Sequence, residues 1–306
     1  MKQQHYIQTP VYRSHKLSKN LNKNIFYKMD CYQPSGSFKI RGMEHLCRHH
    51  IQQGCRNFVA SSGGNAGYSL AYVGQQLGVE VHVVVPSTTP QTMIDKITNL
   101  GAQVEVQGSV WDEAHHYALQ LAEEKQAVYV SPFDDPLLWK GHATLMEECA
   151  QQMEQPDALV VSVGGGGLLC GVFEGLKRNG WNSTTVIPAE TVGAASFEAS
   201  FSAGELVEIE AIRSIATSLG AKKVTQKALD LAADFKVQPF TMSDSEAVQS
   251  VLSFLDEYNV LVEPACGASL AAPLLHPEIL ENFDSVLVIV CGGVNTNVEK
   301  YLEFVK

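Results

Sequence analysis

The sequence predicts an α/β protein with two three-layer domains and mostly parallel sheets. Short apolar runs rich in β-branched residues alternate with helical patterns of about ten to fifteen residues, which is typical of βαβ crossovers. Glycine or proline ends most of these segments, which marks the boundaries between strands and helices. The chain has 306 residues, of which 45% are hydrophobic and 18% charged, and this length suffices for two domains.

In the first half of the chain, one strand is expected at 24–28 and one helix at 42–53. Gly54 stands where a glycine commonly ends a helix, and Gly78 and Gly101 do the same for later helices. Pro86 ends an apolar strand. The regular part that follows alternates strands at 57–60, 79–85, 102–106 and 127–131 with helices at 66–77, 90–100 and 110–125.

The stretch Pro132-Phe133-Asp134-Asp135-Pro136 interrupts this pattern, and we expect a domain boundary near 132–138. Residues 196–237 are less periodic, which predicts short helical pieces. The remaining segments are expected as strands at 158–163, 185–188 and 286–290 and helices at 137–153, 168–178, 244–258 and 267–275.

Composition excludes several classes of function. The net charge is −11, which argues against nucleic acid or an anionic membrane as the main partner. No apolar run reaches membrane-spanning length, and no hydrophobic segment of a signal peptide follows the N-terminus. The seven cysteines contain no Cys-x-x-Cys pair, so we expect a reducing, cytoplasmic location rather than a disulfide framework.

Four consecutive glycines, Gly164 to Gly167, follow an apolar strand and open a helix. Backbone N–H groups in such a turn can converge on an anion, and the helix dipole assists them. A Walker loop is excluded because Val172 and Phe173 occupy the positions of its Lys and Ser/Thr. We interpret the run as a cradle for a phosphate monoester.

A dinucleotide site remains the second interpretation of this run. Leu169 stands at the third glycine position of that fingerprint and is too bulky for it. Glu190, however, lies near the place of a ribose-binding acid, expected about 20 residues on.

Three further stretches carry residues that could form a binding site together with the four glycines. The loop 61–67, Ser-Ser-Gly-Gly-Asn-Ala-Gly, leads into a helix N-terminus that could hold a carboxylate. Cys291 follows the last buried strand, where a side chain faces the ligand crevice of a parallel sheet. Lys39 lies in Ser35-Gly36-Ser37-Phe38-Lys39-Ile40-Arg41-Gly42 and supplies an amine. Together these are the parts that a pyridoxal-phosphate site needs.

With these motifs in order, the sequence resembles the pyridoxal-phosphate enzymes of fold type II, the tryptophan synthase β family. It is most similar to the L-serine/L-threonine dehydratases of the short, liver type. The resemblance covers nearly the whole chain and rests on residues 35–42, 61–67, 131–136, 162–171, 190–197, 262–268 and 288–295. It implies a small domain, 39–137, that carries the Asn65 loop, and a large cofactor-binding domain made of 1–38 and 138–306.

The resemblance also implies the site residues. Lys39 matches the Schiff-base lysine and general base. The residues that match cofactor contacts are Phe38, Lys39, Asn65, Gly164, Gly165, Gly166, Gly167, Leu168 and Cys291. Those that match the substrate loop are Ser62, Gly63, Asn65 and Ala66. Those that match a monovalent-cation site, expected to hold K⁺, are Gly164, Glu190, Ala194, Leu219 and Ala221.

The implied reaction is β-elimination, which converts L-serine to pyruvate, or L-threonine to 2-oxobutanoate, with release of ammonia. A neutral thiol at Cys291 carries no fixed negative charge toward the ring nitrogen, which favours elimination over transamination. Gly63 has no proton to give where serine racemases carry a serine, so racemisation is disfavoured. Three alternatives stay open: β-replacement of the cysteine synthase type, γ-replacement of the threonine synthase type, and a non-catalytic amino-acid or cofactor-binding homologue. The expected assembly is a homodimer that binds a small amino acid.

Overall fold

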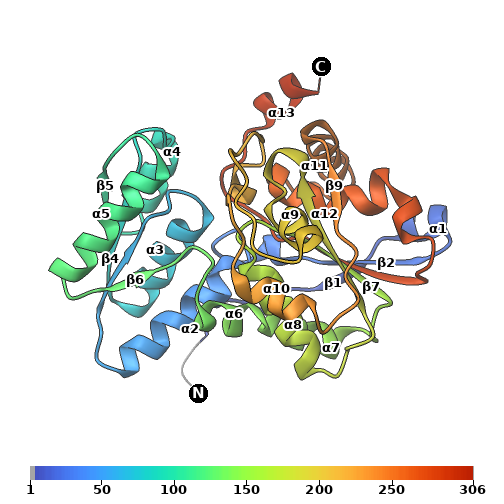
Figure 1. Ribbon diagram of the computed structural model, residues 1–306, viewed down its shortest axis with the longest axis horizontal. Helices are drawn as coiled ribbons and strands as arrows, with labels where there is room; N and C mark the ends of the chain where they lie inside the picture. The colour runs from blue at the N-terminus through green and yellow to red at the C-terminus, as the bar shows by residue number, and fades with distance from the viewer. Residues whose placement is uncertain (1–3, 306) are drawn as a thin grey trace. The chain divides into compact units, whose positions relative to one another are not determined.

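The structure is a computed structural model that describes residues 4–305 (Figure 1). It divides into two compact units. The first unit comprises residues 4–7 and Gln33–His142, and the second comprises Gln8–Tyr32 and residues 143–305. Each unit has its own sheet and its own buried core.

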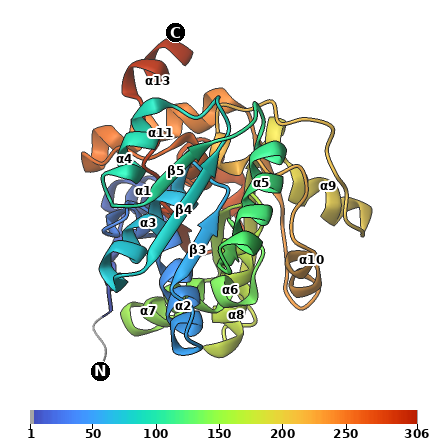
Figure 2. The same ribbon diagram turned by 90° about the vertical axis from the view of Figure 1, so that its left-hand side faces the viewer.

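The first unit is built on a four-stranded sheet in the order β5-β4-β3-β6, and all pairs are parallel. Figure 2 shows α5 on one side of this sheet and α3 and α4 on the other. The strands are β3 Asn57–Ala60, β4 Glu80–Val85, β5 Gln103–Val106 and β6 Val128–Val130. The helices are α2 Lys39–Gln52, α3 Asn65–Leu77, α4 Gln91–Thr98, α5 Trp111–Glu124 and α6 Pro136–His142.

The second unit is built on a six-stranded sheet in the order β1-β2-β10-β7-β8-β9. Every neighbouring pair is parallel except β1 with β2. The strands are β1 Val11–Arg13, β2 Asn24–Lys28, β7 Ala158–Ser162, β8 Thr185–Thr191, β9 Phe240–Met242 and β10 Ser285–Ile289.

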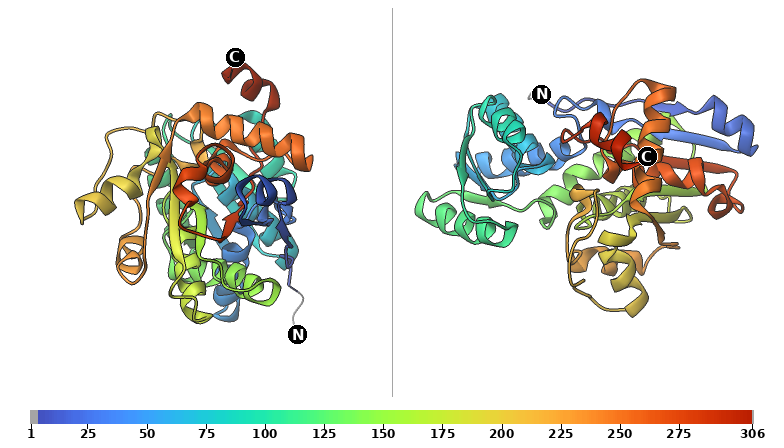
Figure 3. Two further views of the ribbon diagram at one scale, coloured as in Figure 1. Left: turned by 90° about the vertical axis from the view of Figure 1, so that its right-hand side faces the viewer. Right: turned by 90° about the horizontal axis from the view of Figure 1, so that it is seen from above.

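Helices cover both faces of this second sheet. Figure 1 shows α11 and α12 above it and α7, α8 and α10 below, and the left view of Figure 3 shows the same layers from the side. The helices are α1 His15–Leu21, α7 Thr144–Gln152, α8 Gly167–Arg178, α9 Ser196–Ala203, α10 Gln226–Ala232, α11 Asp244–Tyr258, α12 Pro264–Leu275 and α13 Val298–Phe304. Short 3₁₀ turns lie at Asp30–Tyr32, Val192–Ala194, Thr217–Leu219 and Pro277–Leu280.

The predicted fold class is confirmed: two three-layer α/β units with mostly parallel sheets. Parallel strands are buried on both faces, and β7 accordingly has all five residues buried. Ligand-binding loops of such sheets gather at the carboxyl ends of the strands. The loop after β3, the glycines after β7 and Cys291 after β10 all lie at carboxyl ends.

Several element boundaries differ from the prediction, and two of these differences bear on the site and on the two units. Lys39 is the first residue of α2, not part of a loop that precedes a helix at Gly42. The single helix expected at 137–153 is two helices, α6 and α7, because the chain passes between the units at His142 and Ala143. The first unit is also larger than the expected domain 39–137, since it includes residues 33–38 and 138–142.

Within residues 4–305, no helix combines the length and the apolar character that crossing a membrane requires. All seven cysteines lie in this range, and none of them is joined in a disulfide.

Candidate active site

Lys39 begins helix α2 in the first unit. Its Nζ donates a 2.5 Å hydrogen bond to the carbonyl oxygen of Pro132 and lies 5.1 Å from the centroid of the Phe38 ring. Phe38 is the N-cap residue of the helix, and no side chain caps the helix there. The amine is therefore held at a helix start by a carbonyl and an aromatic face.

Close packing between α2 and α6 fixes this helix start. A Cβ on Gly42 would lie 2.5 Å from Cε1 of His142, and a Cβ on Gly141 would lie 2.5 Å from the carbonyl oxygen of Arg41. The His142 ring also meets the Phe38 ring edge-on, with centroids 4.9 Å apart. Glycine at both positions lets the two helices approach, and His142 then packs against the residue beside Lys39.

The expected substrate loop joins β3 to α3. Helix α3 has Gly64 as its N-cap and no side-chain cap, so its first backbone N–H groups face outward from the helix end. The Ser62 hydroxyl accepts a 3.3 Å bond from the N–H of Gly64. A Cβ on Gly67 would collide with the carbonyl oxygen of Ser62, so the tight turn requires glycine there.

The first unit brings Lys39 and this loop to one edge of its sheet. Strands β3 and β6 are parallel neighbours, with Ala60 paired with Val130. The loop follows Ala60, and Pro132, the hydrogen-bond acceptor of Lys39, follows Val130 closely. An amine and a helix N-terminus at one sheet edge suit an amino-acid ligand, whose carboxylate would meet the N–H groups.

In the second unit, Gly164 to Gly167 form the turn between β7 and α8. Gly166 has φ 89°, a left-handed conformation that favours glycine, and it caps α8 without a side-chain bond. The Gly165 carbonyl accepts a 3.0 Å bond from Thr225 N–H. A Cβ on Gly164 would lie 3.0 Å from the Ser218 carbonyl oxygen. This loop offers backbone N–H groups at a helix start, as a phosphate requires.

Cys291 shares a sheet edge with those glycines, because β10 and β7 are parallel neighbours. The Cys266 thiol and burial raise the pKa of Cys291 well above its usual value, so the thiol is neutral near pH 7. Leu168 is also buried, in the first turn of α8. The second unit therefore brings the expected phosphate loop and the expected ring-nitrogen partner together.

Glu263 is a neighbour of this group that the sequence did not assign. Its carboxylate accepts a 2.8 Å bond from Asn295 N–H and a bond from the Ser218 hydroxyl. A Cβ on Gly293 would collide with it. The signal available from sequence was Pro264 at the first position of α12, which marks a helix start but not these long-range bonds.

Glu190, expected at a cation site, lies in β8 and is 1% exposed. It accepts 2.9 and 2.8 Å bonds from the N–H groups of Phe197 and Glu198 at the start of α9. Burial raises its pKa to about 8. Leu219 packs against Gly164, and its carbonyl accepts a 2.7 Å bond from Ala221 N–H.

Residues 4–305 contain no cluster of three or more His, Cys, Asp or Glu side chains that could hold a metal ion. A cation beside Glu190 would therefore depend on backbone carbonyl oxygens, such as that of Ala194 in the turn Val192–Ala194.

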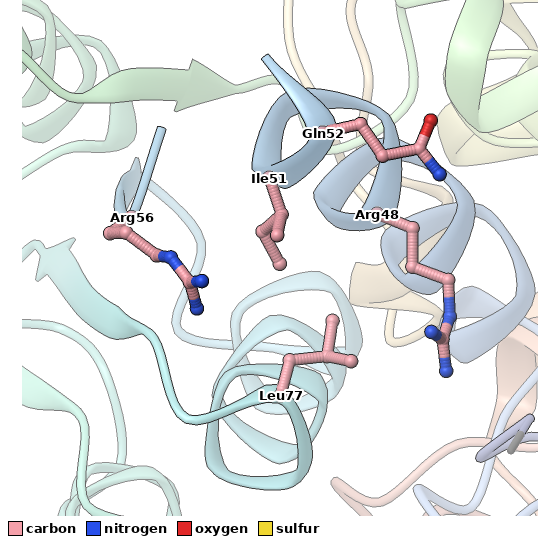
Figure 4. Close-up of a pocket in the computed structure, with 5 residues that line it drawn as sticks. All are labelled: Arg48, Ile51, Gln52, Arg56 and Leu77. Atoms are coloured by element: carbon pink, nitrogen blue, oxygen red, sulfur yellow. The ribbon is translucent and has the colours of Figure 1, made fainter. Parts of the chain in front are cut away.

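A hollow of about 230 Å³ lies in the first unit. Figure 4 shows the side chains that line it: Arg48, Ile51, Gln52, Arg56 and Leu77. Ile51 lies twelve residues after Lys39 on α2, about 18 Å along the helix axis. None of the expected site residues lines this hollow, so it is separate from the candidate site.

Comparison with known proteins gives the family. A family model described as pyridoxal-phosphate dependent enzyme matches residues 2–292. The human protein named L-serine dehydratase/L-threonine deaminase is 46% identical over 300 residues, 95% of this chain and 92% of its own. The Dictyostelium discoideum L-serine dehydratase is 39% identical, over 96% of this chain and 89% of its own.

Among solved structures, an L-serine ammonia-lyase from the fungus Rhizomucor miehei superimposes with a TM-score of 0.93. It is 36% identical, and the match covers 99% of this chain and 98% of that one. The chain therefore belongs to the family of pyridoxal-phosphate dependent enzymes and uses pyridoxal phosphate as its cofactor.

Proposed function

We propose that this protein is an L-serine/L-threonine dehydratase, a lyase that releases ammonia by β-elimination. The observation that carries the proposal is the likeness, over nearly the whole chain, to enzymes named for this reaction in human, slime mould and fungus. L-Serine would give pyruvate, and L-threonine 2-oxobutanoate. The hydroxyl group leaves as water, and hydrolysis of the resulting enamine releases ammonia.

The residues proposed to contact the cofactor form two groups. The first group is Lys39, Phe38 and Asn65. The glycines 164–167, with Leu168, would hold its phosphate, because their turn accommodates an anion where a side chain would crowd the Ser218 carbonyl. Pyridoxal phosphate supplies an electron sink for the negative charge that develops at the substrate Cα.

Lys39 is the proposed general base. Its Nζ is held between the Pro132 carbonyl and the Phe38 ring, so the amine has a fixed position from which to take the Cα proton. The substrate carboxylate would be bound by the loop residues Ser62, Gly63, Asn65 and Ala66. The uncapped start of α3 supports this assignment, because its N–H groups suit an anion.

Cys291 would face the ring nitrogen. Its thiol is neutral because the Cys266 thiol and burial raise its pKa. A neutral group does not hold the ring nitrogen protonated, so charge at Cα would be short-lived and loss of the β-hydroxyl would follow quickly. This supports elimination rather than transamination.

A K⁺ ion at Gly164, Glu190, Ala194, Leu219 and Ala221 is part of the proposal. The buried carboxyl of Glu190, with its raised pKa, supports it, because an adjacent cation would favour the ionised form. We also propose that the protein is a cytoplasmic homodimer, and sedimentation of the purified protein tests the assembly. Its seven cysteines form no disulfide, which is compatible with a reducing compartment.

The test of the reaction is ketoacid release from L-serine by the purified holoenzyme, with no second substrate. Pyruvate and ammonia in equal amounts are expected. Activity that requires sulfide would instead indicate β-replacement. A holoenzyme that binds L-serine without any turnover would indicate a non-catalytic homologue.

A further inference from the structure

A hydrogen-bonded series of three side chains begins at Ser61, the first residue of the loop 61–67. The Ser61 hydroxyl lies 2.8 Å from the Tyr129 hydroxyl, which lies 2.8 Å from Nδ1 of His115. Ser61 is fully buried and is the first residue after β3. Its side chain is therefore tied to two residues more than fifty positions away in the sequence.

Rigid elements hold all three residues. Tyr129 lies in β6 and is paired with Val59 of β3, the strand that ends one residue before Ser61. His115 lies on α5, which packs on β3 and β4 through Ala114 and Ala118. The Trp111 ring stacks on the His115 ring, with centroids 4.7 Å apart and planes within 6°. This stack covers one face of the imidazole.

Both titratable members are neutral near pH 7. Burial raises the pKa of Tyr129 to about 12 and lowers the pKa of His115. The neutral imidazole can accept a hydrogen bond from the Tyr129 hydroxyl or donate one to it, and that hydroxyl also bonds to Ser61. Because the Tyr129 hydroxyl is itself held by His115, its hydrogen bond to Ser61 fixes the Ser61 side chain in one orientation.

We propose that Tyr129 and His115 are positioning residues that set the substrate-carboxylate loop through Ser61. Residues 62–66 follow Ser61 directly in the sequence. The hydrogen bonds that orient Ser61 therefore also fix the position at which the loop begins. The inference rests on the proposed function, because it assigns the loop to the carboxylate of the substrate. These residues do not touch the reacting atoms in the proposal.

The test compares Tyr129→Phe with Tyr117→Phe. Tyr117 lies on the same helix as His115, is partly buried, and donates a 3.1 Å bond to Glu105, so its variant loses a hydroxyl of the same kind elsewhere. We expect Tyr129→Phe to raise KM for L-serine about 3- to 10-fold, from the usual strength of one hydrogen bond, with kcat within about twofold. Tyr117→Phe should leave both constants unchanged.

Binding of the free amino acid glycine provides a second measurement, which does not require turnover. It has the amine and carboxylate of the substrate but no leaving group, and its binding to the holoenzyme is followed by visible absorption. The dissociation constant for glycine should rise by the same factor as KM. Ser61→Ala should match Tyr129→Phe, and the double variant should add nothing to either. His115→Gln, which keeps a polar partner, should lose less affinity than His115→Ala.

Unchanged KM and glycine affinity in folded Tyr129→Phe or Ser61→Ala would overturn the proposal. So would a fall in Tm or kcat with both affinities intact, since that pattern indicates only stability or chemistry. A wild-type protein that binds glycine but makes no ketoacid from L-serine would instead refute the proposed function. The glycine titrations would then still decide the role of Tyr129.

Discussion

Thr89 fills the space beside Gly63. A Cβ built on Gly63 would lie 2.6 Å from Cγ2 of Thr89 and 3.1 Å from Cγ1 of Val85, closer than atoms in a packed core approach each other. Thr89 is itself held in a turn, where its N–H donates a 3.0 Å bond to the Pro86 carbonyl. A side chain at position 63 therefore requires either Thr89 or the loop to shift.

This relationship predicts how Gly63→Ala behaves. The added methyl group would push the loop or Thr89, and we expect kcat/KM for L-serine to fall about tenfold, from the usual cost of overpacking. Thr89→Ala removes the obstructing atoms, so the double variant should recover most of the loss. Steady-state kinetics of both single variants and the double variant measure this. Equal losses in the single and double variants would show that Thr89 is not the cause.

Lys39→Ala is expected to abolish ketoacid formation while the protein stays folded. The variant removes the proposed base and the hydrogen bond to Pro132, but it leaves the packing of Gly42 against His142 in place. Activity is measured with L-serine and L-threonine, and folding by circular dichroism. Appreciable turnover by the variant would remove Lys39 from its assigned role.

The pKa of Glu190 predicts a dependence of stability on pH. Burial raises this pKa to about 8, above the value of 4.5 expected for an unfolded chain. The folded protein then binds the proton more tightly, so the stabilisation is complete below about pH 4.5 and is lost as the pH rises through 8. In K⁺-free buffer, Tm should therefore fall between about pH 6 and pH 9, and less steeply in Glu190→Gln.

Potassium should stabilise the folded protein mainly near pH 9, the alkaline end of the range over which Tm is expected to fall. A cation beside the carboxylate would lower the pKa of Glu190, so K⁺ should raise the Tm of the wild type more near pH 9 than near pH 6. Glu190→Gln should lose both this effect and any K⁺ activation. The same salt response in both proteins would exclude Glu190 from a cation site.

A buried ion pair in the second unit predicts a loss of stability. Lys28 is fully buried, and its Nζ donates a 2.6 Å bond to Glu148 and a 2.7 Å bond to the Thr9 carbonyl. Glu148→Gln leaves this cation without its counter-charge and should lower the free energy of unfolding by about 3 kcal/mol. Urea denaturation measures the change.

The control for that variant is Glu147→Gln. Glu147 pairs with Arg178 at 2.8 Å, but its side chain is 42% exposed. The free energy of unfolding should change by less than about 0.5 kcal/mol, because water screens exposed pairs. Similar losses in the two variants would contradict the role given to burial.

The regular strands and helices could be predicted because each carries its own local signal. Strands such as β7 are short apolar runs, and glycines end helices α3 and α4 or follow them closely. The start of α2 was placed at Gly42, three residues too late. Its N-cap is Phe38, which provides no capping side chain, so the sequence has no usual start signal there.

Other elements lack a local signal of sufficient length. Strands β1 and β9 have three residues each, too few for a clear pattern, and lie at the two edges of their sheet, so they were not predicted. The break between α6 and α7 was missed because it lies where the chain passes from the first unit to the second, at His142 and Ala143. No local sequence signal marks that passage.

The candidate site divides in the same way. Lys39, the loop 61–67, the four glycines and Cys291 stand in recognisable local motifs, which is why the sequence could propose them. The bond between Tyr129 and Ser61, and those from Ser218 and Asn295 to Glu263, join segments far apart in the sequence. No local pattern marks these partners, and a single sequence could not identify them.

Chemical trapping of the cofactor tests the central claim most directly. Borohydride reduction of the yellow holoenzyme, followed by proteolysis and mass spectrometry, identifies the lysine that is joined to the cofactor. The account predicts that the visible band disappears and that the phosphopyridoxyl group is found on the peptide that contains Lys39. A label on a different lysine, or a holoenzyme that turns over L-serine with no label on Lys39, would contradict it.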